Sequence, residues 1–206
     1  MITKLIVKKV LGLGSLLLAA ALFGTGCAGT KPLPKAYIDS KHNLTVSVVK
    51  IPEKPQMMDS GQGGILGAII TATSRNSMMK EMLAGVQGET VKELIRQEVS
   101  RVFQEKFSIV DTGDDLKLDI EVGTYGFFVP TTVAGIKTGA YQFQITGRVM
   151  VFDAKNNSKR VALGGAVAQA PLGSKPTKEA VPEAISQCVQ KFAEQVMASL
   201  INEKCK

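Results

Sequence analysis

The chain has 206 residues, of which 45% are hydrophobic and 21% are charged. This is enough material for one well-buried core and too little for two. The formal net charge is +7, but three of its lysines, Lys4, Lys8 and Lys9, lie in the first nine residues, so the remainder carries +4. Its basic residues are scattered among acidic ones and form no stripe interleaved with aromatics, which argues against a nucleic-acid partner.

The N-terminus has the three-part pattern of an export signal. Met1 to Lys9 is basic, Val10 to Phe23 is almost wholly apolar, and small residues then lead to Cys27. The apolar part is shorter than the ~20 residues of a spanning helix. The pattern therefore predicts a cleaved signal peptide over residues 1–26, with a plain secretory signal or an uncleaved anchor as the alternatives.

The tail of this signal, Gly24-Thr25-Gly26-Cys27, resembles the lipobox of bacterial lipoproteins, although Gly24 stands where that family usually has Leu, Val or Ile. The resemblance implies cleavage before Cys27, acylation of its thiol, for example with palmitate, and usually acylation of the new amine. Two or three acyl chains anchor a protein stably to a membrane. Because Ala28 follows in place of Asp, the resemblance implies the outer membrane of a double-membraned bacterium, with the protein facing the periplasm. Residues 27–42 then read as the acylated N-terminus and a tether.

Beyond the tether, hydrophobic periodicity predicts seven elements. Alternation predicts strands over residues 43–51, 116–122, 141–151 and 161–167, and a short strand over 107–110. A capping-box pattern from Thr90 to Glu93 and the apolar spacing after it predict a helix to about Lys106. A second amphipathic helix is predicted over 177–201, with Cys188 on its buried stripe and Cys205 beyond disulfide reach on a continuous helix; a disulfide between them, or a dimer through Cys205, stays the alternative.

This element order predicts a single α+β domain over residues 43–206. Strands with one apolar face need a cover, and two amphipathic helices can supply it. We therefore expect a two-layer sandwich in which a mostly antiparallel sheet of about four to five strands carries both helices on one face. By element order only, over residues 43–204, the domain resembles small envelope assembly and auxiliary lipoproteins.

A Gly-rich apolar insertion at residues 60–87 interrupts this pattern. Its Gly-rich part, residues 60–74, is not a phosphate-binding loop, because Ala68 rather than Lys follows the last glycine of that part, Gly67. Two interpretations remain, namely a further core helix, or a surface that contacts a membrane or partner through residues 60–83. The candidate contact residues are Ile65, Leu66, Ile69, Ile70, Met78 and Met79.

Catalytic patterns are sparse. His42 is the only histidine and lies beside the tether, so no hydrolase triad is indicated. The segment from Ile109 to Gly113 resembles the Asp-Thr-Gly motif of aspartic proteases, with Asp111 as the carboxylate. That chemistry needs a second carboxylate, and no second copy of the motif exists. The acidic turn also lacks calcium-loop spacing. We expect no enzyme, no cofactor and no metal.

Three functional hypotheses remain. The first is a membrane-anchored envelope lipoprotein that acts as a non-enzymatic binding, assembly or auxiliary module. Its expected partner is an envelope protein, and its oligomeric state is undetermined. The second is an envelope hydrolase of the aspartic-protease type that uses Asp111. The third is an oligomeric, secretion- or pore-associated lipoprotein that uses residues 60–83.

Overall fold

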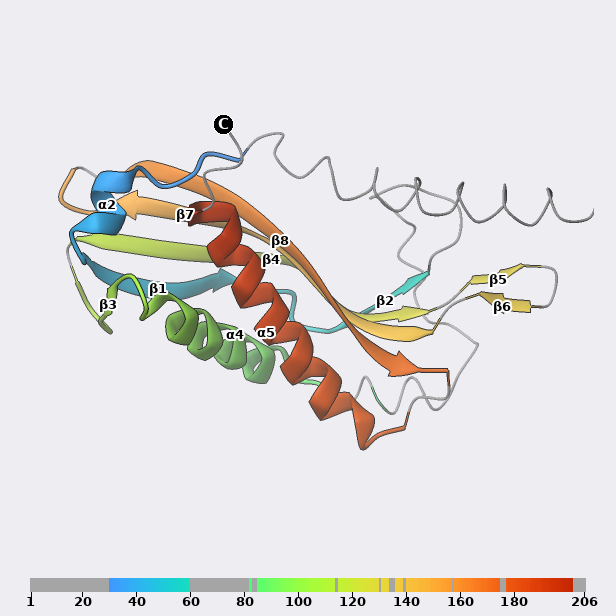
Figure 1. The fold of residues 1–206 in the computed structure, drawn as a ribbon. Coiled ribbons are helices and arrows are strands. Elements are labelled where there is room, and N and C mark those ends of the chain that lie inside the picture. Colours follow the sequence, from blue (N-terminus) through green and yellow to red (C-terminus); the bar gives the residue numbers. More distant parts are fainter. Residues whose placement is uncertain are drawn as a thin grey trace, which may run out of the picture.

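A computed structural model describes residues 30–59, 82, 85–113, 115–129, 131–133, 136–138, 140–156, 158–174 and 177–201. Within these residues a six-stranded sheet and two long helices form two layers (Figure 1). The strands of this sheet are β1 (Asn43–Lys50), β2 (Gln56–Asp59), β3 (Ser108–Ile109), β4 (Leu116–Val129), β7 (Tyr141–Asp153) and β8 (Lys159–Gly173). The helices are α2 (Lys35–Asp39), α4 (Gly88–Phe103) and α5 (Ala180–Ile201), and β5 (Thr131–Val133) pairs with β6 (Ile136–Thr138) in a separate ribbon.

The strand order is β3-β1-β4-β7-β8, and β2 also pairs with β4. The three long strands β4, β7 and β8 are antiparallel to one another, whereas β1 is parallel to both β3 and β4, and β2 is parallel to β4. The predicted α+β sandwich is therefore confirmed. The sheet is mixed, however, and has one strand more than expected, because β2 is only four residues long and too short to carry an alternation signal.

Both long helices lie on one face of the sheet, as predicted (Figure 1). Along β4 and β7 every second residue points into the layer between sheet and helices, and the large side chains there, such as Leu118, Phe143 and Ile145, are fully buried. β8 presents a row of small residues to α5: Ala162, Gly164, Ala166, Ala168 and Ala170. A Cβ added at Gly164 would lie 2.4 Å from Ser199 Oγ, so these small residues let the helix approach closely.

The start of α4 differs from the prediction. The helix begins at Gly88, after Gln87 as N-cap, and Thr90 lies inside its first turn, so the predicted capping box does not form. A Cβ at Gly88 would lie 3.1 Å from the carbonyl oxygens of Pro52 and Glu53 and from the Tyr125 hydroxyl. Close packing against the β1–β2 connection, rather than a side-chain cap, therefore fixes this helix end.

The tether predicted over residues 27–42 is shorter than expected, because the chain is packed against the domain from Lys31 onward. Lys31 pairs with Leu163 of β8 through two backbone hydrogen bonds of 2.7 and 2.8 Å. Leu33 donates its N–H to the Leu200 carbonyl at 2.8 Å and buries its side chain. The Tyr37 hydroxyl of α2 then donates to Asp153 Oδ2 at 2.7 Å. Backbone pairing of this kind leaves no periodic pattern in a sequence.

Candidate functional site

Several residues singled out from the sequence lie outside the described residues. These are Cys27, Ile65, Leu66, Ile69, Ile70, Met78, Met79 and Cys205. Four residues at the C-terminal end of the insertion are described: Met82 and Val86 are buried in the core, whereas Gly85 and Gln87 are exposed. Met82 is the only described residue of the range 60–83, so the choice between the core and the surface interpretation of that range stays a prediction.

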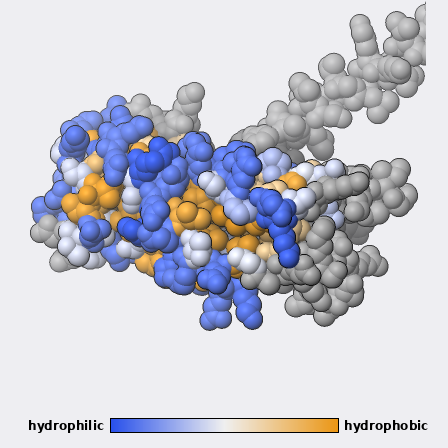
Figure 2. Space-filling view, turned by 90° about the horizontal axis from the view of Figure 1, so that it is seen from below, coloured by the Kyte–Doolittle hydropathy of each residue, from blue (hydrophilic) through white to orange (hydrophobic). Residues whose placement is uncertain are grey.

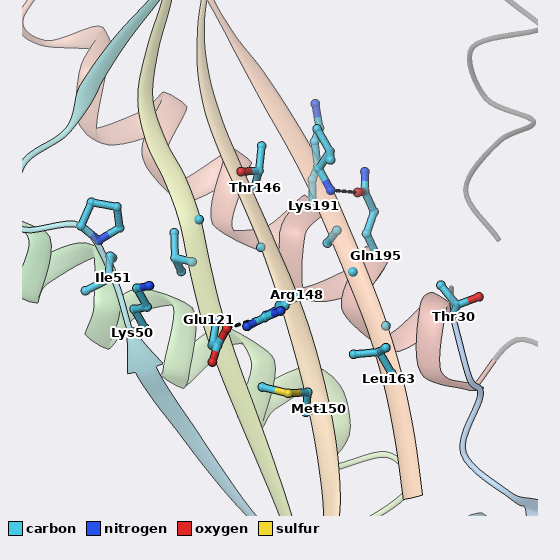
Figure 3. A pocket seen from close by; sticks show the side chains of 18 of the residues that line it. Thr30, Lys50, Ile51, Glu121, Thr146, Arg148, Met150, Leu163, Lys191 and Gln195 are labelled. Carbon is cyan, nitrogen blue, oxygen red and sulfur yellow. Dashed lines mark hydrogen bonds and ion pairs between the residues drawn. The ribbon is translucent and has the colours of Figure 1, made fainter. Parts of the chain in front are cut away.

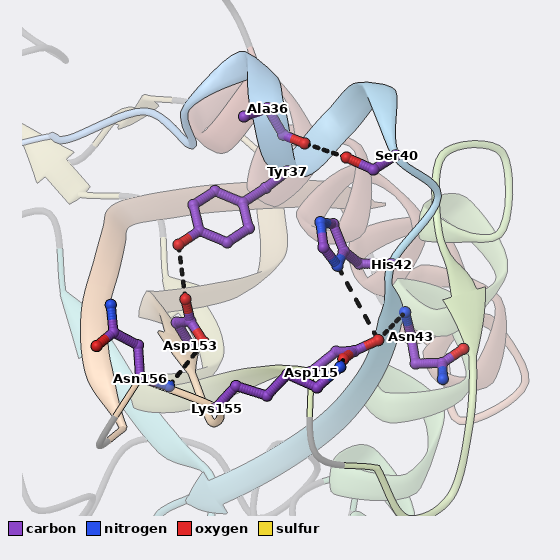
Figure 4. Close-up of polar contacts among 9 residues, drawn as sticks. All are labelled: Ala36, Tyr37, Ser40, His42, Asn43, Asp115, Asp153, Lys155 and Asn156. Atoms are coloured by element: carbon purple, nitrogen blue, oxygen red, sulfur yellow. Dashed lines mark hydrogen bonds and ion pairs between the residues drawn. The ribbon is translucent and has the colours of Figure 1, made fainter.

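Asp111, the carboxylate of the protease-like motif, is exposed in the turn that crosses from β3 to β4. The neighbouring Asp115 makes the contacts of this turn (Figure 4). Asp115 pairs with Lys155 and His42 and accepts the backbone N–H of Asn43 at 3.3 Å. The Lys155 ammonium and the Asn43 N–H hold the pKa of Asp115 below its ordinary value. This arrangement joins two turns and the start of β1, which is a structural role.

Cys188 lies on the buried stripe of α5, as predicted. Its side chain is fully buried, and Sγ donates to the carbonyl oxygen of Ala168 at 3.3 Å. Burial raises the pKa of this thiol to about 12. The neutral thiol is a core group, because only the thiolate is reactive.

A concavity of about 1590 Å³ lies on the sheet face opposite the helices (Figure 3). We call it the sheet groove. β4, β7 and β8 form its floor, the end of β1 with Ile51 and Pro52 forms one side, and Thr30 and α5 contribute at the other side. Its polar side chains are Thr30, Lys50, Glu121, Thr146, Arg148, Arg160, Gln169, Lys191 and Gln195.

An ion pair stands in the middle of the sheet groove. The sheet register places Glu121 beside Lys50 of β1 and beside Arg148 of β7. Arg148 donates Nε to Glu121 Oε2 at 2.5 Å, and its side chain remains 66% exposed. On β8 the residue paired with Arg148 is Gly165, which has no side chain to cover the guanidinium. Glu121 therefore orients Arg148 while its outer nitrogens stay open to the groove.

Of the two rows next to this ion pair, one contains Asp119, which is paired across the sheet with Met150 and forms an ion pair with Lys117 at 3.1 Å. The other row, around Thr146, is uncharged. Thr124 and Thr146 share a hydrogen bond of 2.7 Å, and Gln169 donates to Gln144 at 3.1 Å. Val167 lies beside Thr146, and its apolar side chain is 56% exposed on the floor of the groove. Met150 and Leu163 form a second apolar pair across β7 and β8. The floor therefore combines cationic and apolar surface.

The outer edge of β8 forms one rim of the sheet groove and is covered by three groups. Lys31 pairs with Leu163 through the backbone. From α5, Gln195 accepts the N–H of Val167 at 3.0 Å, and Lys191 donates to the carbonyl of Gln169 at 3.2 Å. An exposed strand edge can recruit foreign strands, and these contacts occupy backbone groups of that edge at Leu163, Val167 and Gln169.

Four basic residues and one acidic residue line the sheet groove, namely Lys50, Arg148, Arg160 and Lys191 against Glu121. This site has no local sequence signal, because its charges are dispersed over more than a hundred residues. The outward alternation of β4 and β7 placed Glu121 and Arg148 on a polar face, but only the sheet register brings them together.

The helix side of the molecule has a different surface (Figure 2). Figure 2 shows patches of hydrophobic residues between hydrophilic ones on this side. Leu94 of α4 is 37% exposed. A smaller concavity of about 450 Å³ lies between α4 and α5. In the part of the chain that the structure describes, no three His, Cys, Asp or Glu side chains gather as a metal site would require, and no helix is long and apolar enough to cross a membrane.

No family model and no curated protein matches the chain. Among solved structures, protein XCC0632 of Xanthomonas campestris, of the family DUF330, is 18% identical, with 78% of this chain and 83% of that chain covered and a TM-score of 0.46. A hypothetical protein of Chlamydia trachomatis, CT253, is 10% identical, with 77% and 95% covered and a TM-score of 0.44. Lipoprotein GNA1162 of Neisseria meningitidis is 16% identical, with 74% and 99% covered and a TM-score of 0.25. With TM-scores below 0.5, these similarities bear on neither the family nor the function of this chain.

Proposed function

We propose that the chain is a lipid-anchored envelope protein that binds a component of the envelope through its sheet groove and catalyses no reaction. The observation that carries the proposal is the sheet groove itself, a large concavity on a sheet face that the helices leave open. The Gly24-Thr25-Gly26-Cys27 sequence supports the anchor, and Cys27 would carry the lipid at the periplasmic side of the outer membrane.

The absence of catalysis is part of this proposal. Asp111 is exposed in its turn, and the only histidine, His42, contacts Asp115 rather than Asp111. We therefore expect Asp111→Asn to leave the fold and the biological role of the protein unchanged, measured by complementation of a deletion strain. Loss of complementation by a folded Asp111→Asn protein would instead support a hydrolase.

The anchor is tested by metabolic labelling. Cys27→Ala should accumulate as unprocessed precursor that takes up no labelled palmitate, whereas Cys188→Ala, which alters a buried thiol, should be processed and labelled like the natural chain. Equal labelling of the Cys27→Ala chain would contradict the proposal.

The binding surface is tested by photo-crosslinking in intact cells. A photoreactive residue at Val167, which is 56% exposed, reports on the sheet groove, and one at Leu94, which is 37% exposed, reports on the helix side. We expect a discrete adduct from position 167 and none of the same mass from position 94. Identical adduct patterns from both positions would show that the groove is not the binding surface.

A further inference from the structure

The sheet groove lies very close in the chain to the proposed anchor. Thr30 lines the groove, and Lys31 is fixed to Leu163 by two backbone hydrogen bonds. Only three residue steps separate Thr30 from Cys27. At 3.3–3.6 Å per residue they span at most about 11 Å, against about 50 Å if residues 27–42 were a free tether. A lipid on Cys27 would therefore hold this rim of the groove near the bilayer surface.

The charges of the groove differ from those of the helix side. Lys50 and Arg160 have no ion-pair partner among the described residues, and Arg148 uses only Nε on Glu121. On α4, by contrast, the basic residues are each paired with a glutamate three positions earlier in the chain: Lys92 with Glu89, Arg96 with Glu93, and Arg101 with Glu98. The groove therefore carries net positive charge, whereas these cations of the helix side are neutralised.

We propose that the sheet groove binds the phosphate groups of anionic phospholipids in the same bilayer that holds the acyl chains of Cys27. This inference rests on the proposed lipid anchor. Arg148, oriented by Glu121, offers its free guanidinium nitrogens to a phosphate, and Lys50 of β1 and Arg160 of β8 add charge from the two edge strands of the groove. Met150, Leu163 and Val167 contact the glycerol and the first methylenes. Basic residues near an anchored surface act together with the lipid as a second membrane signal.

Membrane lipid is favoured over an acidic peptide by the position of the groove. An anchor of three residues keeps the groove at the level of the lipid head groups and leaves little room for a protein between them. The rim at β8 is also closed to strand addition by Lys31, Gln195 and Lys191, and strand addition is a common way for an extended peptide to bind a sheet.

The test uses the acylated protein, carrying Cys205→Ser, reconstituted in vesicles of phosphatidylcholine alone or with 30 mol% phosphatidylglycerol. A fluorophore is attached at Val167→Cys in the groove or, as control, at Leu94→Cys on the helix side. Quenching by neutral acrylamide reports the exposure of the fluorophore. We expect about threefold or greater protection at position 167 in the anionic vesicles, its loss in 0.5 M salt, and no difference at position 94.

The variants separate groove charge from total charge. Lys50→Gln with Arg160→Gln should abolish the protection at position 167, since each basic residue removed weakens the attraction on the order of fivefold. Lys92→Gln with Arg101→Gln removes the same charge from α4 and should retain the protection. If both pairs of substitutions reduced the protection at position 167 equally, the inference would be overturned, because the protection would then depend only on the net charge of the protein.

The remaining outcomes identify other ligands or a failed anchor. Equal quenching at position 167 in both vesicles, with the protein bound to them, overturns lipid binding but leaves the anchor intact. Protection in neutral vesicles by 10 mM inorganic phosphate or by polyglutamate, without an effect of phosphatidylglycerol, overturns it in favour of a free anion or an acidic peptide. A protein that neither takes up palmitate nor sediments with vesicles overturns the proposed function together with this inference.

Discussion

The two faces of the β4–β7–β8 sheet are built from alternate residues of the same strands, yet they have opposite properties. Along β7, Phe143, Ile145 and Val149 are fully buried under the helices, whereas Thr146 and Arg148 line the sheet groove. The helix face is filled so closely that its glycines admit no added atom. The open face carries charge, exposed glycine and an exposed valine. The packed core therefore lies on one face of the sheet, whereas the other face is open to solvent.

The largest expected difference between the faces concerns thiol chemistry at Cys188. Burial raises its pKa from 9 to about 12, so at pH 8 the folded protein should hold about a thousandfold less thiolate there than the unfolded chain. Modification by iodoacetamide, mapped to Cys188 by mass spectrometry, should be negligible in the native protein and rapid in urea. Similar rates in both states would mean that the helix face opens readily.

The same shift predicts a pH dependence of stability. Because the unfolded thiol ionises near pH 9 and the folded thiol near pH 12, unfolding releases a proton in this range, and the free energy of unfolding should fall as the pH rises from 9 to 12. Cys188→Ala should lack this component of the pH dependence. The matched comparison is needed because lysines and tyrosines titrate in the same range.

Phe192 of α5 tests how much stability the helix face holds. Its ring is fully buried and lies against β7, so Phe192→Ala should lower the free energy of unfolding by about 3–5 kcal/mol. The control is Met150→Ala on the open face, where the side chain is only partly buried and the loss should stay below about 1 kcal/mol. Urea titration measures both. Comparable losses would show that the open face is also part of the core.

Two glycines give a finer comparison. A Cβ at Gly147 would lie 2.9 Å from the Glu121 carbonyl oxygen and 3.0 Å from the Phe192 ring, so Gly147→Ala should cost about 1–3 kcal/mol. A Cβ at Gly123 would meet atoms of Thr146 at 3.6 and 3.8 Å, which is ordinary contact, and Gly123→Ala should change stability by less than about 0.5 kcal/mol. Combining Gly147→Ala with Phe192→Leu should restore part of the loss. No recovery would place the strain at the backbone contact.

Sequence periodicity predicted the strands and the face that each buries, because half-buried strands show their burial locally. Leu116, Leu118 and Ile120 alternate with charged residues, and the structure buries all three of them. Periodicity could not predict that β1 runs parallel to β4, since strand pairing depends on the whole chain. It also could not show that Lys31 and Leu33 are fixed to β8 and α5, because backbone hydrogen bonds do not depend on side-chain type.

The sheet groove depends even more on long-range register. Glu121 and Arg148 are 27 residues apart, and a shift of one residue between β4 and β7 would move one of them to the other face. The bulge between Val122 and Thr124 lies next to this pair and sets the alternation beyond it. The alternation within each strand predicts that Glu121 and Arg148 point outward. Their ion pair, and the position of Gly165 beside it, depend on how the strands are paired in the sheet.

Substitutions in the Glu121–Arg148 pair should change the stability of the protein little. They should nevertheless alter lipid protection at the sheet groove, which distinguishes the open face from the buried one. Arg148 is 66% exposed, so solvent screens the pair, and Glu121→Gln or Arg148→Gln should change the free energy of unfolding by no more than about 1 kcal/mol. Their effects on lipid protection at position 167 should have opposite signs. Glu121→Gln removes the only acidic residue of the groove and should increase protection, whereas Arg148→Gln should decrease it.

The double variant decides what Glu121 does for Arg148. If Glu121 only cancels charge, the effects of the two substitutions on protection should add. If Glu121 also orients the guanidinium, Glu121→Gln should give less protection than the change in charge alone predicts. In the double variant, which lacks Arg148, this shortfall in protection should be absent. Urea titration of the same variants supplies the control, because a loss above about 2 kcal/mol in either single variant would mean that the pair stabilises the sheet and that the open face is not free of structural constraint.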